Sequence, residues 1–124
     1  MGKYLNRNVL DGYAGLSRGV EQLTVRGSRR LFPCSGATVV GPISYEVLEP
    51  MQRVWFRLEA NECQPLAFDW VYEAALPPAT EERTHQRTPL GDRVIADLVR
   101  YHQIGTASGW IELDGIRNEM DPDE

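Results

Sequence analysis

The sequence lacks most of the features that would mark a membrane, metal-binding or disulfide-stabilised protein. Its 124 residues contain no run approaching the roughly 18 consecutive apolar residues of a membrane helix, and the N-terminus has no apolar segment typical of a secretory signal. Cys34 and Cys63 stand apart, with no CxxC or histidine-rich neighbourhood. We therefore predict a cytoplasmic protein with no disulfide, no bound metal, no cofactor and no membrane partner.

Positive charge is also scarce, and it is unevenly placed. The chain carries 13 Lys and Arg against 18 Asp and Glu, for a net charge of −5. Six of the basic residues and only two of the acidic ones lie in residues 1–34, so the rest of the chain is strongly acidic. Because non-specific nucleic-acid binding depends on neutralising phosphates, we predict no nucleic-acid partner and interpret Arg26, Arg29 and Arg30 as a solvated turn.

Helix signals are nearly absent, because Gly or Pro interrupts most windows before apolar residues recur at helical spacing. Strand signals replace them. Residues 20–27 and 37–50 read as short β-rich runs, the second divided by Gly41-Pro42. In 53–59, Val54, Phe56 and Leu58 alternate with charged residues, as in a strand with one face on a core.

The strongest strand signal lies in residues 65–76, PLAFDWVYEAAL. Leu66, Phe68, Trp70, Tyr72, Ala74 and Leu76 share one face of this predicted strand. We predict that Phe56, Phe68, Trp70 and Tyr72 form either plain core or the apolar wall of a ligand pocket. Asp69 and Glu73 fall on the other face, where they meet water or need partners.

The remaining segments complete an all-β reading. Residues 79–92 are polar and predict a long loop that contains His85, and 93–105 alternate again as a strand. Asp114-Gly115 predicts a two-residue type I′ hairpin turn. We expect an N-terminal extension at 1–19, a single β domain at 20–120 and an acidic tail at 121–124. The predicted fold is an antiparallel meander of about seven strands, forming a lipocalin-like half-barrel or a sandwich.

The candidates for chemistry are few, since the sequence contains no GxSxG, HExxH, P-loop or GxGxxG pattern. Arg100 and His102 share a predicted face with Val94 and Leu98, so a buried Arg100 would need a carboxylate, and Asp69 or Glu73 is the expected partner. One interpretation is an ordinary cluster of polar side chains that hydrogen-bond one another at a strand end. The other is a polar patch at a pocket mouth, with His102 as a candidate acid or base.

The segment RYHQIGTASGWIELDG carries a family resemblance. Its Arg100-Tyr101, Gln103, Gly105, Gly109 and Asp114-Gly115 resemble the RY-x-Q-x-G…G…DG pattern of uncharacterised bacterial proteins distantly similar to carotenoid hydratase (hydroxyneurosporene synthase) and its lipocalin-like relatives. The resemblance implies two lipocalin-like halves, with an Asp-His-Ser-Trp-Gly motif after the hairpin. This chain lacks that motif, so the resemblance implies a partial segment, and no residue maps onto the acid of the hydratase.

Three hypotheses follow from these patterns. The first is a lipocalin-like domain that binds an apolar isoprenoid- or steroid-like molecule through the four aromatic residues, with Arg100 and His102 orienting the ligand. The second is part of a hydratase- or isomerase-type enzyme, with a carboxylate such as Asp69 or Glu73 as the acid and with Arg100 and His102 orienting. The third is a structural β module that forms a homodimer or pairs with a companion β domain.

Overall fold

The computed structural model describes residues 1–123, and over these residues the chain is an all-β protein with antiparallel sheets, as predicted. Glu124, the last residue of the predicted acidic tail, lies outside the described residues. The elements are β1 (Gly2–Tyr4), the 3-10 turn η1 (Leu5–Arg7), β2 (Val9–Arg18), β3 (Glu21–Arg30), β4 (Val39–Val40), β5 (Ile43–Glu49), β6 (Arg53–Leu58), β7 (Leu66–Ala74), β8 (Ala79–Thr80), β9 (Thr84–Arg87), β10 (Val94–Leu98), β11 (Tyr101–His102), β12 (Gly105–Leu113) and β13 (Ile116–Met120).

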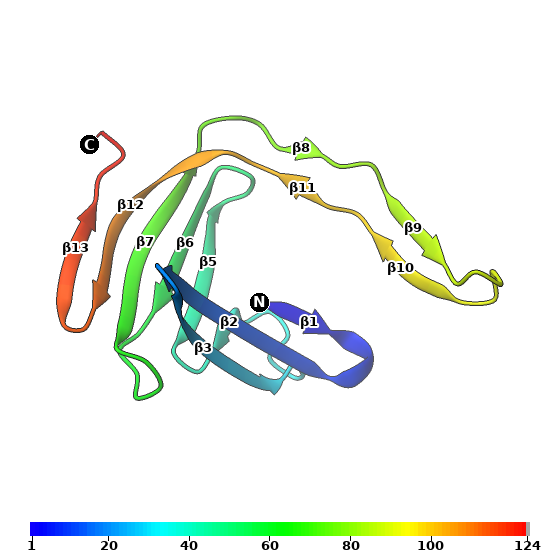
Figure 1. Cartoon of the computed structure of the whole chain (residues 1–124), viewed down its shortest axis with the longest axis horizontal. Coiled ribbons are helices and arrows are strands. Elements are labelled where there is room, and N and C mark those ends of the chain that lie inside the picture. The colour runs from blue at the N-terminus through cyan, green and yellow to red at the C-terminus, as the bar shows by residue number, and fades with distance from the viewer. Residues whose placement is uncertain (124) are drawn as a thin grey trace.

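The main sheet has six strands in the order β13-β12-β7-β6-β5-β4 (Figure 1). Each strand pairs antiparallel with its neighbour, so this sheet is the meander that the alternating sequence predicts. Asp114 and Gly115 both have positive φ and join β12 to β13, which confirms the predicted two-residue turn. The sheet stays open rather than closing into a barrel, with β13 and β4 at its edges.

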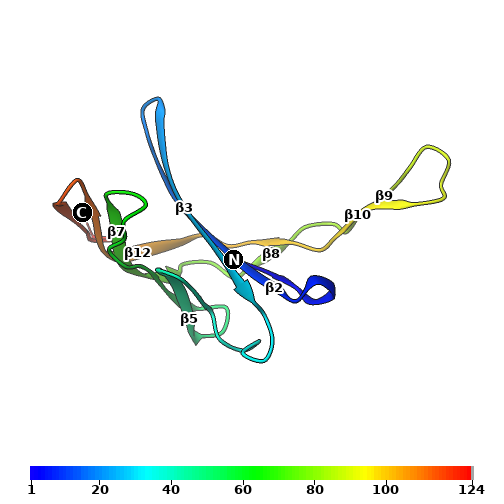
Figure 2. The same cartoon turned by 90° about the horizontal axis from the view of Figure 1, so that it is seen from below.

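A second sheet, β1-β2-β3, crosses one face of the main sheet (Figures 1 and 2). We expected residues 1–19 to be an extension ahead of the β domain. Instead they form β1, η1 and β2, and Leu10 and Ala14 are buried. The signal for β2 is the alternation Leu10, Gly12, Ala14 and Leu16. It was missed because glycines on both faces of β2 weaken the apolar pattern from which a strand is predicted.

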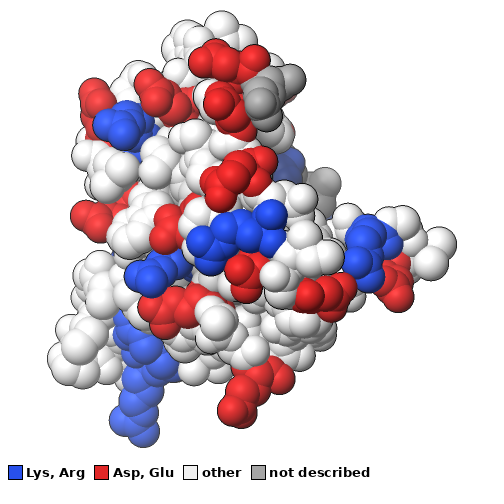
Figure 3. Space-filling model, turned by 90° about the vertical axis from the view of Figure 1, so that its left-hand side faces the viewer, with Lys and Arg blue, Asp and Glu red and all other residues white. Residues whose placement is uncertain are grey.

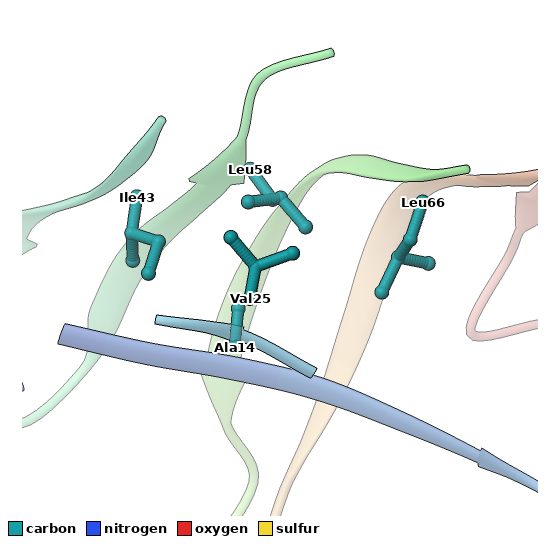
Figure 4. Packing of buried hydrophobic residues seen from close by; sticks show 5 residues of the cluster. All are labelled: Ala14, Val25, Ile43, Leu58 and Leu66. Atoms are coloured by element: carbon teal, nitrogen blue, oxygen red, sulfur yellow. The ribbon is translucent and has the colours of Figure 1, made fainter. Parts of the chain in front are cut away.

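The core lies between these two sheets. Ala14 and Val25 of the β2–β3 hairpin point toward Ile43, Leu58 and Leu66 of the main sheet (Figure 4). Leu58 is fully buried and Val25 is 1% exposed. Burial of these side chains, at roughly 1.5–3 kcal/mol for each large one, holds the hairpin on the sheet.

A pair of glycines lets the hairpin approach the main sheet closely. Gly12 and Gly27 lie directly opposite each other in β2 and β3. A Cβ on Gly27 would lie 3.0 Å from a Val40 methyl, and one on Gly12 would lie 3.4 Å from side-chain carbons of Val40 and Ile43. Val40 fills the space that these two missing side chains leave, and it is itself buried.

The chain between β7 and β12, residues 75–104, forms a long projecting ribbon that we call the arm (Figures 1 and 2). Its two halves pair as β8 with β11 and as β9 with β10. The predicted loop at 79–92 therefore contains strand residues, and the predicted strand at 93–105 is broken into β10, β11 and the start of β12. None of the arm residues is buried. Within residues 1–123, no helix has the length and apolar character that crossing a membrane would require.

Candidate functional site

Four aromatic rings form a continuous surface on the face of the main sheet that the β2–β3 hairpin covers only in part. Phe56 and Trp70 stack with centroids 4.7 Å apart, Phe68 lies 6.2 Å from Trp70, and Tyr45 lies 6.3 Å from Phe56. Phe68 packs against the core, whereas the other three rings extend beyond it. All four side chains are half-buried, so part of this aromatic surface meets solvent.

The surface is apolar because of the strand register. Phe56 faces Trp70, Phe68 faces Ile111, and Tyr72 faces Ala107 across neighbouring strands, so their side chains share one face. The positions of this face along β6, β7 and β12 carry no charged residue. They are Val54, Phe56 and Leu58 in β6, Leu66, Phe68, Trp70, Tyr72 and Ala74 in β7, and Gly105, Ala107, Gly109, Ile111 and Leu113 in β12.

Tyr72 extends this surface toward the arm. A Cβ on Gly105 would lie 2.5 Å from carbons of the Tyr72 ring, so the ring occupies the space above this glycine. The Tyr72 hydroxyl is buried and has no hydrogen-bond partner in the described part of the chain. Such a group costs about 1–3 kcal/mol relative to a satisfied one, and it is the one side-chain polar atom of this kind among residues 1–123.

The opposite face of the same sheet holds the predicted carboxylates. The Trp55 indole N–H donates to Oδ1 of Asp69 at 2.6 Å, and Nε of Arg57 lies 3.8 Å from its Oδ2. Glu73 is exposed and faces Arg53 in the register. Asp69 and Glu73 therefore point away from the aromatic surface.

Acidic and basic side chains alternate over the side of the molecule seen in Figure 3, where β13 forms the edge of the main sheet.

Arg100 and His102 lie on the arm and not beside the aromatic rings. Nε of Arg100 donates to Oε2 of Glu81 at 2.8 Å, and His102 hydrogen-bonds the other carboxylate oxygen of Glu81. The bond with His102, with a further contribution from the charge of Arg100, holds the pKa of Glu81 below its usual range. Asp69 and Glu73 were the wrong partners for Arg100, because the arm carries its own carboxylate and Arg100 remains mostly exposed.

A second cluster of the same kind lies further along the arm. Asp97 accepts hydrogen bonds from Nε and Nη2 of Arg83 at 2.7 and 2.6 Å, and Nδ1 of His85 lies 3.7 Å away. The bonds from Arg83 hold the pKa of Asp97 below its usual range. Both histidines of the chain therefore sit beside a carboxylate that also holds an arginine. These hydrogen bonds and ion pairs connect the two strands of the arm.

Tyr45 and Glu81 were not predicted from the sequence as site residues. Tyr45 joins the aromatic surface from β5, and its place on the ISYEV strand, two residues after buried Ile43, was the available signal. Glu81 was missed because it follows a Pro-Pro pair in a stretch without periodicity. Cys34 and Cys63 are exposed free thiols, and residues 1–123 contain no group of three potential metal ligands.

These features define an antiparallel β protein with an open sheet, a partly exposed aromatic face and a projecting ribbon arm. By sequence, the chain belongs to the family of unknown function DUF8625, whose pattern matches residues 1–124. No curated protein and no solved structure matches the chain. The similarity to carotenoid hydratase and the cytoplasmic location remain predictions.

Proposed function

We propose that this protein binds an apolar, ring-containing or isoprenoid-like small molecule on the aromatic face of its main sheet. The observation that carries the proposal is the contiguous surface of Tyr45, Phe56 and Trp70, which is uncharged, partly exposed and only partly covered by the hairpin. Aromatic side chains offer large contact areas at little entropic cost, and ligand sites are lined mainly by such residues.

The Tyr72 hydroxyl, which has no hydrogen-bond partner within residues 1–123, leads us to expect a polar group on the ligand. Tyr72 lies on the same face as Trp70, and its buried hydroxyl has no partner among the described residues. A ligand with one hydroxyl or carbonyl group that reached this atom would supply the missing hydrogen bond. Alcohols and ketones of the isoprenoid or steroid class combine that single polar atom with an apolar body.

Tryptophan fluorescence tests the proposal directly. In Trp55→Phe/Trp110→Phe protein, Trp70 is the one remaining indole, and we expect saturable fluorescence changes with farnesol or progesterone. Phe56→Leu keeps an apolar side chain but removes the stacked ring, and we expect at least tenfold weaker binding, or about 1.4 kcal/mol. Phe32→Ala is the control, since Phe32 is exposed outside this face. Absence of saturation, or equal weakening by both changes, would refute the proposal.

A second candidate function, self-association through the arm, is supported by a different observation. Eight large apolar side chains of the arm are 44–90% exposed: Leu76, Leu90, Val94, Ile95, Leu98, Val99, Tyr101 and Ile104. A two-stranded ribbon is marginally stable alone in water, so we propose that the arm packs on the arm of a second copy. Four Arg balance four Asp and Glu within the arm, so two arms approach without the repulsion expected from a net charge of −5.

Light scattering tests this second candidate. We expect the protein to be dimeric at micromolar concentration and Leu98→Lys/Val99→Lys protein to be monomeric. The control is Val20→Lys, which charges a fully exposed valine at the β2–β3 turn. A monomeric wild-type protein, or a dimer that survives the arm substitutions, contradicts self-association. Both results leave the ligand proposal standing, because the aromatic face lies on the main sheet.

A further inference from the structure

The outer face of the β1-β2-β3 sheet, which points away from the core, contains two adjoining hollows. The first has a volume of about 620 Å³ and is lined by Asp11, Tyr13, Arg26 and Ser28 among others. The second, of about 500 Å³, is lined by Arg7, Ser28 and Arg30 among others. Ser28 lines both, so the two hollows adjoin at this residue of β3. Their sizes fall in the range of small-molecule sites.

Strand alternation places these side chains together. In β3, Val25 is buried in the core, so Arg26, Ser28 and Arg30 project to the outer face. Asp11 faces Ser28 and Tyr13 faces Arg26 in the β2–β3 register. Gly12 and Gly27 form part of the lining of the larger hollow with their backbone.

The arginines that project from this face have no carboxylate partner in the described part of the chain. Arg57, Arg83 and Arg100 each pair with a carboxylate, but Arg7, Arg26 and Arg30 make no ion pair within residues 1–123. Of the described residues that line the two hollows, Asp11 alone is acidic. Arg29 also lines the second hollow, but its guanidinium donates to backbone carbonyls. The three other guanidinium groups against one carboxylate make this a positive surface on an acidic protein.

One of these side chains is held over its hollow. The Arg26 guanidinium carbon lies 5.7 Å from the centroid of the Tyr13 ring, within the range of a cation–π contact. The Tyr13 hydroxyl in turn accepts a hydrogen bond from Nε2 of Gln22 at 2.8 Å, which fixes the ring. The arrangement presents a guanidinium, a serine hydroxyl and a tyrosine ring at one place.

We propose that this outer face binds a phosphate group carried by an organic molecule. Guanidinium groups donate paired hydrogen bonds to phosphate oxygens, Ser28 adds a hydroxyl donor, and Tyr13 offers a ring against which an organic part packs. The site is independent of the aromatic face of the main sheet, because the core separates the two surfaces. The phosphate belongs either to a soluble metabolite-sized molecule or to a lipid headgroup.

Nuclear magnetic resonance titration tests this proposal. We expect saturable amide shifts at Gly12, Gly27 and Ser28 with phenyl phosphate, smaller shifts with inorganic phosphate, and reversal by salt. Vesicles containing phosphatidylglycerol form a separate arm of the experiment. Binding to them with no response to phenyl phosphate identifies the headgroup as the source of the phosphate.

Matched variants separate a built site from a general effect of charge. We expect Arg26→Gln/Arg30→Gln to weaken phenyl phosphate binding at least tenfold. Arg93→Gln/Arg53→Gln removes the same charge from two arginines that also lack an ion pair within residues 1–123 but lie outside these hollows. Equal weakening by the two pairs, or no localised shift with any probe at millimolar concentration, would overturn the proposal.

Discussion

Phe56 and Trp70 stack across the β6–β7 pair with their ring planes inclined by 30°, and they occupy directly opposed positions in the register. Cross-strand aromatic pairs of this kind contribute roughly 0.5–1.5 kcal/mol beyond the area that they bury. The stack thus stabilises the sheet and also forms the centre of the proposed ligand surface. Loss of either ring is expected to affect both properties, so binding is best measured on variants whose folding has been verified.

The core between the hairpin and the main sheet depends on Leu58. This side chain is fully buried and packs with Ala14, Val25 and Ile43. We expect Leu58→Ala to lower the free energy of unfolding by about 2–5 kcal/mol, since it removes apolar contacts and leaves a cavity. Urea denaturation measures the loss. Val20→Ala, at a fully exposed position, is expected to change the free energy by less than about 0.5 kcal/mol.

Arg29 stabilises the segment between β3 and β4 rather than binding an acid. Its guanidinium donates to the backbone carbonyls of Val39, Arg30, Ala37 and Cys34 at 2.7–3.3 Å. We expect Arg29→Met to lower the melting temperature and to cost about 1–3 kcal/mol, because these carbonyls lose a charged donor. Arg30→Met is the control, and an equal effect of the two changes in thermal denaturation would contradict the role assigned to Arg29.

Gly109 is required by the backbone of β12. Its φ is +139°, and an added Cβ would lie 2.2 Å from the carbonyl oxygen of Asp69. We expect Gly109→Ala to displace β12 from β7 and to destabilise the protein by more than about 1 kcal/mol. Gly36→Ala meets nothing within 4 Å and has no positive φ, so it should have little effect on chemical denaturation. Similar midpoints for the two variants would show that β12 tolerates the side chain.

Order in the arm is expected to depend on pH through Glu81. Its pKa is lowered by the hydrogen bond with His102 and by Arg100. A lowered folded-state pKa means that the stabilisation is fully present above the ordinary carboxyl value of about 4.3 and is lost as pH falls below it. Cross-strand NOEs between Thr80 and Tyr101, which pair in β8 and β11, should therefore weaken on acidification. In Glu81→Gln protein this dependence on the Glu81 carboxyl should disappear, and an unchanged pH profile would contradict the assignment.

Much of the fold was predictable from local alternation. Apolar and polar residues alternate regularly in the strands that contain Phe56 and Trp70, so both strands and the face that these two rings share were predicted. The Asp114-Gly115 turn was predicted because a two-residue hairpin turn needs positive φ at both positions, which Asp-Gly favours. The strand at residues 20–27 was predicted and forms most of β3, but β1 and β2 were not predicted, because in β2 Gly12 contributes to packing by its lack of a side chain. Nothing in a strand pattern shows that a neighbouring backbone will approach so closely.

The sequence by itself therefore determined the all-β class, the aromatic face and its lack of charge, since side-chain direction in a strand depends only on alternation. Tertiary structure alone decided which carboxylate meets Arg100, because Glu81 lies 19 residues away and is brought near by pairing within the arm. It also decided that β2 and β3 cover part of the aromatic face and that Arg26 and Arg30 line two adjoining hollows. Such relationships depend on contacts between distant segments, for which the local pattern carries no information.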